Sequence, residues 1–107
     1  MAHEVFLRPK ARQDLIEQAL YIGEENRDAA DRFLRAVERA LDALAHLPEM
    51  GASRQFDNPA LEGIRMWPVG GFEKHLIFYR LLETGIEVIR ILHAARDLQA
   101  IMADEEG

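Results

Sequence analysis

The chain has 107 residues, of which 49% are hydrophobic and 30% are charged, and this balance is typical of one folded domain spanning residues 1–107. Its formal net charge of −6 argues against a general nucleic-acid binder, because phosphate contacts need a concentrated basic surface. The absence of cysteine excludes disulfides and thiolate metal sites.

A strand and a helix are the first predicted elements. The segment His3–Arg8 is rich in β-formers and precedes Pro9, which lacks the amide proton that a central strand needs. Apolar residues recur at helical spacing from about Ala11 to Glu25, joined by Ile16 and Leu20. We therefore expect a short strand followed by an amphipathic helix of about four turns.

A second helix is predicted after the polar stretch Glu24–Asp28. Asp28 is a suitable N-cap, because its carboxylate can accept hydrogen bonds from the free amides of a first turn. An apolar stripe then runs from Ala30 to Leu47, and Pro48 and Gly51 end the helix. The two helices are expected to form a hairpin.

The second half of the chain is predicted to form a β-meander. The segment Gly51–Gly63 shows little periodicity and is expected to be a loop. Three runs rich in β-formers follow, separated by Gly70-Gly71 and Glu83-Thr84-Gly85: Ile64–Val69, His75–Leu82 and Ile86–Leu92. A short helix over Ala94–Ala103 is expected last, with an exposed acidic tail that frays.

This order of elements favours an α+β fold. A helical hairpin would cover one face of an antiparallel sheet, which the N-terminal strand and the three-stranded meander form together. The opposite face of the sheet is expected to be free.

Short motifs occur in a specific order along almost the whole chain. They are Arg8-Pro9, Ala30-Asp31-Arg32-Phe33, Leu47-Pro48-Glu49-Met50-Gly51, Gly63-Ile64-Arg65, Leu76-Ile77-Phe78-Tyr79-Arg80, Ile86–His93 and Ala95-Arg96-Asp97-Leu98. Together they resemble ParE-type toxins of the RelE/ParE toxin–antitoxin superfamily. The resemblance implies a RelE-like fold and a type II toxin that poisons DNA gyrase, serves plasmid stabilisation and is neutralised by a cognate ParD-like antitoxin.

The superfamily also contains ribosome-dependent messenger-RNA endonucleases of the RelE type. Those relatives typically carry an arginine just after the last strand and a tyrosine in the final helix, and the corresponding positions here are Ala94 and Ala100. His75, which is only partly charged near neutral pH, occupies the place of a phosphate-holding arginine. The resemblance therefore favours a toxin that is not an enzyme. A RelE-type endonuclease and a toxin with another target are the alternatives.

Five residues form a candidate target-binding site on the sheet face and at the final helix: Arg65, Arg80, Arg90, His93 and Arg96. Residues 64–96 hold five basic and three acidic residues, the only positive balance along the chain. A tight hairpin at Thr84-Gly85 would bring Arg80 near Arg90, which costs stability unless acids or an anion offset the two charges. Local ion pairs, contact with a partner protein and phosphate chemistry all stay open for the arginines.

His93 is expected to cap a strand end, with an acid or base role as the alternative. No catalytic residue, cofactor or metal site is assigned, because the four histidines lack ligand spacing. No apolar run approaches the roughly 20 residues that cross a bilayer, and the amino terminus does not resemble a signal peptide, so a cytoplasmic location is expected.

The expected partners are proteins. The resemblance implies an antitoxin segment that folds along the toxin's helices and pairs with its sheet, and DNA gyrase as the cellular target. Direct sequence-specific binding of nucleic acid by the toxin alone is not expected, because the net charge is acidic.

Overall fold

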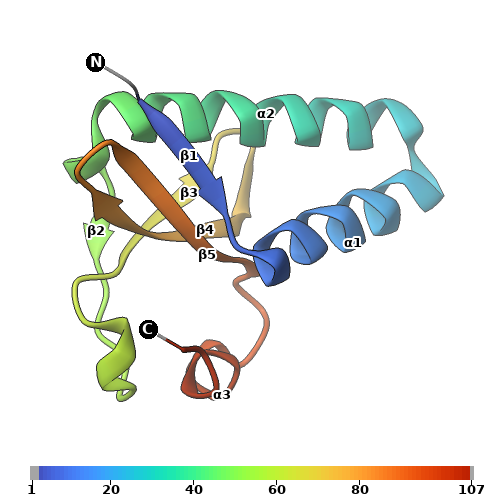
Figure 1. The fold of residues 1–107 in the computed structure, drawn as a ribbon. Coiled ribbons are helices and arrows are strands. Elements are labelled where there is room, and N and C mark those ends of the chain that lie inside the picture. Colours follow the sequence, from blue (N-terminus) through green and yellow to red (C-terminus); the bar gives the residue numbers. More distant parts are fainter. Residues whose placement is uncertain (1–2, 107) are drawn as a thin grey trace.

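The computed structural model describes residues 3–106, and Figure 1 shows their arrangement. The elements in chain order are β1 (Glu4–Leu7), α1 (Pro9–Glu25), α2 (Arg27–His46), a 3₁₀ helix (Pro48–Met50), β2 (Ala52–Ser53), a second 3₁₀ helix (Pro59–Leu61), β3 (Arg65–Val69), β4 (Phe72–Leu82), β5 (Gly85–His93) and α3 (Leu98–Ala103). The predicted α+β fold is confirmed, with a helical hairpin on one side of a sheet.

The sheet has five strands in the order β1-β5-β4-β3-β2. The meander of β3, β4 and β5 is antiparallel, as predicted, and the two-residue strand β2 extends it at one edge. At the other edge β1 pairs in parallel with β5, because the helical hairpin carries the chain from one end of the sheet to the other before the meander begins. The sheet is therefore mixed, with one parallel pair.

The helical hairpin covers one face of the sheet and forms the first core. The apolar stripe of α2 supplies the fully buried Phe33 and Leu44, together with Val37 and Leu41. These residues pack against Ile77, Tyr79, Ile86, Val88 and Ile91 of the sheet. Burying each large apolar side chain contributes about 1.5–3 kcal/mol, so this contact holds the hairpin on the sheet.

The opposite face of the sheet carries a second core, so the expectation of a free face was wrong. Phe78, Ile89 and Leu92 on this face pack against Met102 of α3 and against Leu61 and Ile64 of the loop before β3. The reason is visible in β4, where Leu76, Ile77, Phe78 and Tyr79 are all buried. A strand with consecutive apolar residues needs cover on both faces.

Two helix starts differ from the prediction. Asn26, rather than Asp28, caps α2, because its side-chain oxygen accepts a hydrogen bond from the Ala29 amide at 3.0 Å. Asp28 lies in the first turn, where its charge still suits the helix dipole. Helix α3 begins later than expected, at Leu98, because Asp97 caps it by accepting from the Ala100 amide at 3.1 Å.

A buried tyrosine fastens the end of the helical hairpin to the sheet. The Tyr79 hydroxyl donates to the Pro48 carbonyl at 2.6 Å and accepts from the Gly51 amide at 2.9 Å. Burial raises the pKa of Tyr79 above its usual value, which keeps the hydroxyl protonated. A Cβ at Gly51 would lie 2.3 Å from this hydroxyl, so only glycine fits there.

The Tyr79→Phe variant is expected to lose about 1–3 kcal/mol of unfolding free energy, because it leaves the buried Gly51 amide and the partly buried Pro48 carbonyl without this partner. Urea denaturation followed by far-UV circular dichroism measures the loss. Tyr21→Phe is the matched control, since the Tyr21 side chain is exposed. Equal urea midpoints for the two variants would show that the buried hydroxyl adds nothing to stability.

Candidate functional site

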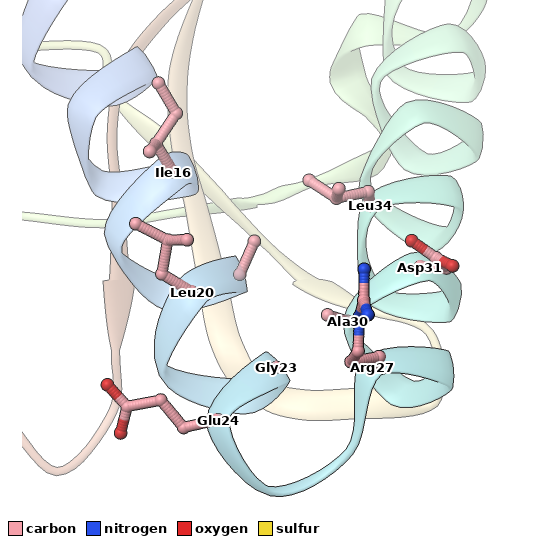
Figure 2. A pocket seen from close by; sticks show the side chains of 9 residues that line it. Ile16, Leu20, Gly23, Glu24, Arg27, Ala30, Asp31 and Leu34 are labelled. Atoms are coloured by element: carbon pink, nitrogen blue, oxygen red, sulfur yellow. The ribbon is translucent and has the colours of Figure 1, made fainter.

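A groove lies between α1 and α2 near the tip of the helical hairpin (Figure 2). Its volume is about 580 Å³, and its lining consists of Ile16, Ala19, Leu20, Gly23, Glu24, Arg27, Ala30, Asp31 and Leu34. The helices come closest where Gly23 faces Ala30, with 3.4 Å from an ideal Cβ at Gly23 to the Ala30 Cβ. Because these residues are small, the larger side chains on either side line an open hollow.

Apolar side chains dominate this groove and remain open to solvent. The exposed fractions are 53% for Ile16, 66% for Leu20 and 40% for Leu34. A second hollow, of about 630 Å³, also includes Ile16 and extends the groove to Leu7 and Pro9 at the start of α1. Exposed apolar side chains that gather in one concave area mark an interaction surface more often than isolated ones do.

Charged residues of both signs border the groove. Glu24 and Arg27 lie at its end near the helix connection, and Asp31 lies on α2 (Figure 2). Apolar residues along the floor and charges at the rim suit an amphipathic helix laid into the groove. The sequence hinted at this surface, because Ile16 and Leu20 widen the apolar stripe of α1 beyond what the sheet can cover.

Of the five predicted target-binding residues, Arg90 is the most firmly held. Its Nε and Nη2 donate to the two carboxylate oxygens of Asp14 at 2.7 and 2.8 Å, and its Nη1 donates to Glu105 at 3.2 Å. The hydrogen bonds to Asp14 raise the pKa of Arg90 further above its ordinary range. This guanidinium is therefore neutralised within the chain.

The expected turn at Thr84-Gly85 was wrong, and Arg80 does not lie directly opposite Arg90. The loop is Glu83-Thr84, and the strand register places Arg80 opposite Glu87. An irregularity between Phe78 and Tyr79 then shifts the pairing, so that Arg90 faces Phe78. Arg80 donates to the Ala60 carbonyl at 2.8 Å, and its Nε lies 4.0 Å from Glu87.

Arg65 points to the other side of the sheet. It lies opposite Tyr79, whose side chain belongs to the first core, whereas Arg80 follows Tyr79 and faces the opposite way. The Arg65 guanidinium donates to the carbonyls of Glu49 and Gly51 at 3.1 and 2.7 Å. Arg65 thus holds the turn that leads from α2 into the sheet.

His93 and Arg96 lie at the end of β5 and in the turn that follows. His93 accepts a hydrogen bond from the Ala95 amide at 3.0 Å, as expected of a residue that caps a strand end. The side chain of Arg96 is exposed. The five candidate residues therefore do not gather in one patch, and their role in target binding stays a prediction.

Sequence reasoning missed two polar residues on the buried side of α1. Beyond Val88, β5 has no neighbour on its β1 side, and α1 supplies the missing contacts. Asp14 accepts from the Ile91 amide at 3.1 Å, and Gln18 donates to the Ile91 carbonyl at 2.7 Å. The available signal was the spacing of Asp14 and Gln18 from Ala11, which places polar residues on the face that contacts the sheet.

The surroundings of His75 are expected to make stability depend on pH. His75 is half-buried. Its Nδ1 lies 2.7 Å from the Gln18 side-chain oxygen, and its ring centroid lies 5.0 Å from that of His93. Burial, and secondly the charge of His93, lower the pKa of His75 below 6.5. The unfolded chain therefore takes up a proton before the folded chain does, so this contribution is present above about pH 6.5 and is lost as the pH falls below it.

Replacing this histidine should reduce the pH dependence. We expect the free energy of unfolding to fall between about pH 7 and pH 5, and to fall less in His75→Gln. Urea midpoints at several pH values measure this, with His3→Gln as a control at an exposed histidine. If both variants keep the slope of the unsubstituted chain, His75 is not its source.

Within residues 3–106, no three histidine, aspartate or glutamate side chains gather in a way that could hold a metal ion. In the same part of the chain, no helix combines the length and apolar character needed to cross a membrane.

Comparisons with known proteins agree with this architecture. Among solved structures, the chain is similar to one described as the chromosomal ParDE toxin–antitoxin system from P. aeruginosa, with a TM-score of 0.66 and 19% identity. The alignment covers 86% of this chain and 98% of that one, and it supports the shared fold. Among curated proteins, none matches the chain in sequence. A model of the family described as the ParE toxin of the parDE type II toxin–antitoxin system matches residues 5–98, and the chain therefore belongs to this family.

Proposed function

We propose that this ParE family member acts by binding proteins rather than by catalysis. Its target is DNA gyrase, which it poisons, and a cognate ParD-like antitoxin neutralises it. The observation that carries the proposal is the exposed apolar groove on the helical hairpin, because a surface of this kind needs a partner to cover it. Because gyrase is a cytoplasmic enzyme, the toxin acts in the cytoplasm. A toxin–antitoxin pair of this kind carried on a plasmid would stabilise that plasmid.

The antitoxin is the partner that best suits the groove. A helix that presents apolar residues at spacings of three and four would contact Ile16, Leu20 and Leu34 together. The second hollow continues the path to Leu7, so a further part of the same segment can follow α1 towards the edge strand β1. A segment that folds on binding can cover such a long path.

The state of the arginines supports binding over catalysis. RNA cleavage needs groups that activate a ribose hydroxyl, stabilise the phosphate and protonate the leaving oxygen. Arg90 is neutralised by Asp14 and Glu105, and Arg80 lies beside Glu87. With a net charge of −6, the chain is better suited to a protein target than to RNA.

A supercoiling assay tests the proposed target. Purified gyrase is incubated with relaxed plasmid and ATP, first with the toxin and then with the toxin and its antitoxin. The expected result is less supercoiling, with cleaved DNA trapped on gyrase, and recovery when the antitoxin is added. Normal supercoiling in the presence of folded toxin would exclude gyrase poisoning.

The alternative activity, ribosome-dependent cleavage of messenger RNA, is tested with the same preparation. Free RNA and messages bound to ribosomes are incubated with the toxin and examined for new ends. The proposal expects intact RNA in both reactions. Cleavage that an Arg80→Ala variant no longer performs would instead establish the endonuclease.

A further inference from the structure

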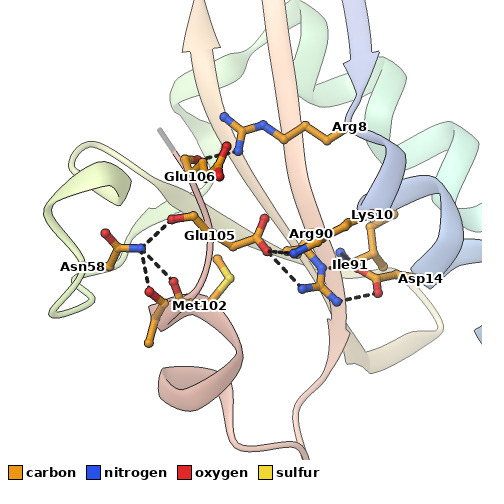
Figure 3. Close-up of polar contacts among 10 residues, drawn as sticks. Arg8, Lys10, Asp14, Asn58, Arg90, Ile91, Met102, Glu105 and Glu106 are labelled. Atoms are coloured by element: carbon orange, nitrogen blue, oxygen red, sulfur yellow. Dashed lines mark hydrogen bonds and ion pairs between the residues drawn. The ribbon is translucent and has the colours of Figure 1, made fainter.

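The acidic segment that follows α3 does not fray, contrary to the expectation from sequence. Only 6% of Glu105 is exposed. One oxygen of its carboxylate lies 3.2 Å from Nη1 of Arg90 and 3.4 Å from Nζ of Lys10 (Figure 3). A carboxylate this buried requires compensating partners, and these two cations provide them.

The backbone of the same segment is held by two further side chains. The Asn58 amide nitrogen lies 2.7 Å from the Glu105 carbonyl, 3.0 Å from that of Met102 and 3.3 Å from that of Ala103. Nη1 of Arg8 donates to the Glu106 carbonyl at 2.6 Å. Side chains from distant parts of the sequence thus bind both the carboxylate and the main chain (Figure 3).

Three of the four side chains that hold the segment, those of Arg8, Arg90 and Asn58, have further contacts. Arg8 pairs with Glu87 at 3.1 Å, and Arg90 keeps both of its hydrogen bonds to Asp14. The side-chain oxygen of Asn58 accepts from the Ala60 amide at 3.0 Å, which orients its amide nitrogen. None of these contacts involves the acidic segment, so we expect these three side chains to keep their positions if the segment left.

Apart from these polar contacts, the segment is held by the packing of one short helix. Helix α3 has six residues, too few to be stable alone, and it rests on the second core mainly through Met102, Leu98 and Ile101. A hollow of about 340 Å³ lies between the segment and Arg8, Pro9 and Lys10. Release of this segment would expose the sheet face that holds Phe78 and Leu92.

We propose that Arg8, Lys10, Asn58 and Arg90 form a binding site for an acidic peptide, and that the chain's own residues 102–106 occupy it as a detachable latch. The ligand class is a segment with an apolar residue three positions before a glutamate, as Met102 precedes Glu105. The apolar side chain enters the second core, Asn58 contacts the main-chain carbonyls of both residues, and Lys10 and Arg90 bind the carboxylate.

The test compares two full-length variants that each lose one acidic charge. Glu105→Gln weakens the latch, and Glu106→Gln is the matched control because the Glu106 side chain is exposed. Heteronuclear ¹⁵N relaxation reports the mobility of the amides of residues 102–106. We expect these amides to become mobile in Glu105→Gln and to stay ordered in Glu106→Gln.

Binding in trans is then measured with a fluorescent peptide of residues 98–106, blocked at both ends. In the unsubstituted chain the attached segment competes at an effective concentration on the order of millimolar, so the peptide should bind poorly. The Glu105→Gln chain should bind it at least about tenfold more tightly, because its own latch has lost a charge-assisted contact. A peptide with glutamine in place of Glu105 should lose that affinity.

Lys10→Ala provides a second arm if Glu105→Gln folds poorly, since the Lys10 side chain is 61% exposed and its loss leaves the Arg90–Asp14 pair intact. Lys10→Ala should loosen residues 102–106, whereas Arg12→Ala on the same helix should not. The proposal is overturned if the segment stays ordered in both Glu105→Gln and Lys10→Ala. It is equally overturned if the Glu105→Gln chain, which keeps all four residues of the site, has a loosened segment and still fails to bind the peptide in trans.

Discussion

An Asp14→Ala variant is expected to lose about 3–5 kcal/mol of unfolding free energy, the cost of breaking a buried ion pair by removing one partner. Asp14 is only 6% exposed, and it accepts hydrogen bonds from Nε and Nη2 of Arg90 and from the Ile91 amide. Alanine would leave a buried guanidinium with one acidic partner and a buried amide with none. The effect is therefore larger than the worth of one surface salt bridge.

Urea denaturation measures this loss, and Glu17→Ala serves as the matched control. Glu17 lies on the exposed face of the same helix and accepts only from Gln13, so its removal should change stability by less than about 0.5 kcal/mol. Asp14→Asn should fall between the two, because an amide oxygen can still accept from the Ile91 amide. If Asp14→Ala and Glu17→Ala unfold at the same urea concentration, the buried pair does not stabilise the fold.

A charge in the groove between α1 and α2 is expected to produce the largest change in partner binding. Leu20→Glu should weaken the antitoxin complex by about 2–4 kcal/mol, roughly 30- to 1,000-fold, because the glutamate must be desolvated against Ile16 and Leu34. The folded state should tolerate the change, since Leu20 is 66% exposed in the free chain.

Isothermal titration calorimetry with the cognate antitoxin measures the loss of affinity. Tyr21→Glu places the same charge on the next residue of α1, outside the lining of the groove. Its affinity should stay within a few-fold of the unsubstituted chain. Equal weakening by the two substitutions would show that the antitoxin binds α1 without using this groove.

Much of the fold could be predicted from local signals in the sequence. Pro9 separates the first strand from α1, Gly70-Gly71 separates β3 from β4, and the apolar stripe of α2 fits its position on the sheet. The second core was predictable in principle, because the run Leu76–Tyr79 contains no polar residue for a solvated face. Helix α3 and the loop before β3 were too irregular in pattern to be assigned as its cover.

The fate of the arginines could not be predicted from the sequence. Asp14 is 76 residues from Arg90 in the chain, and the two meet because β1 is too short to cover the C-terminal half of β5. The residue that Arg90 faces on β4 depends on one irregularity in the pairing of β4 with β5. Composition reveals a surplus of positive charge in residues 64–96, but only the folded structure shows which acids neutralise it.

The parallel pairing of β1 with β5 also constrains how the toxin is made. The first strand of the chain cannot pair until the last strand has been synthesised. At Gly85 the two strands are so close that a Cβ would lie 1.9 Å from the Glu4 carbonyl oxygen. The contacts between α1 and α2 are local in sequence and can form while the ribosome is still translating, whereas the sheet edge closes only after β5 has emerged. If the antitoxin binds this groove as proposed, it can meet the nascent chain before the sheet is complete, and neutralisation would then begin during synthesis.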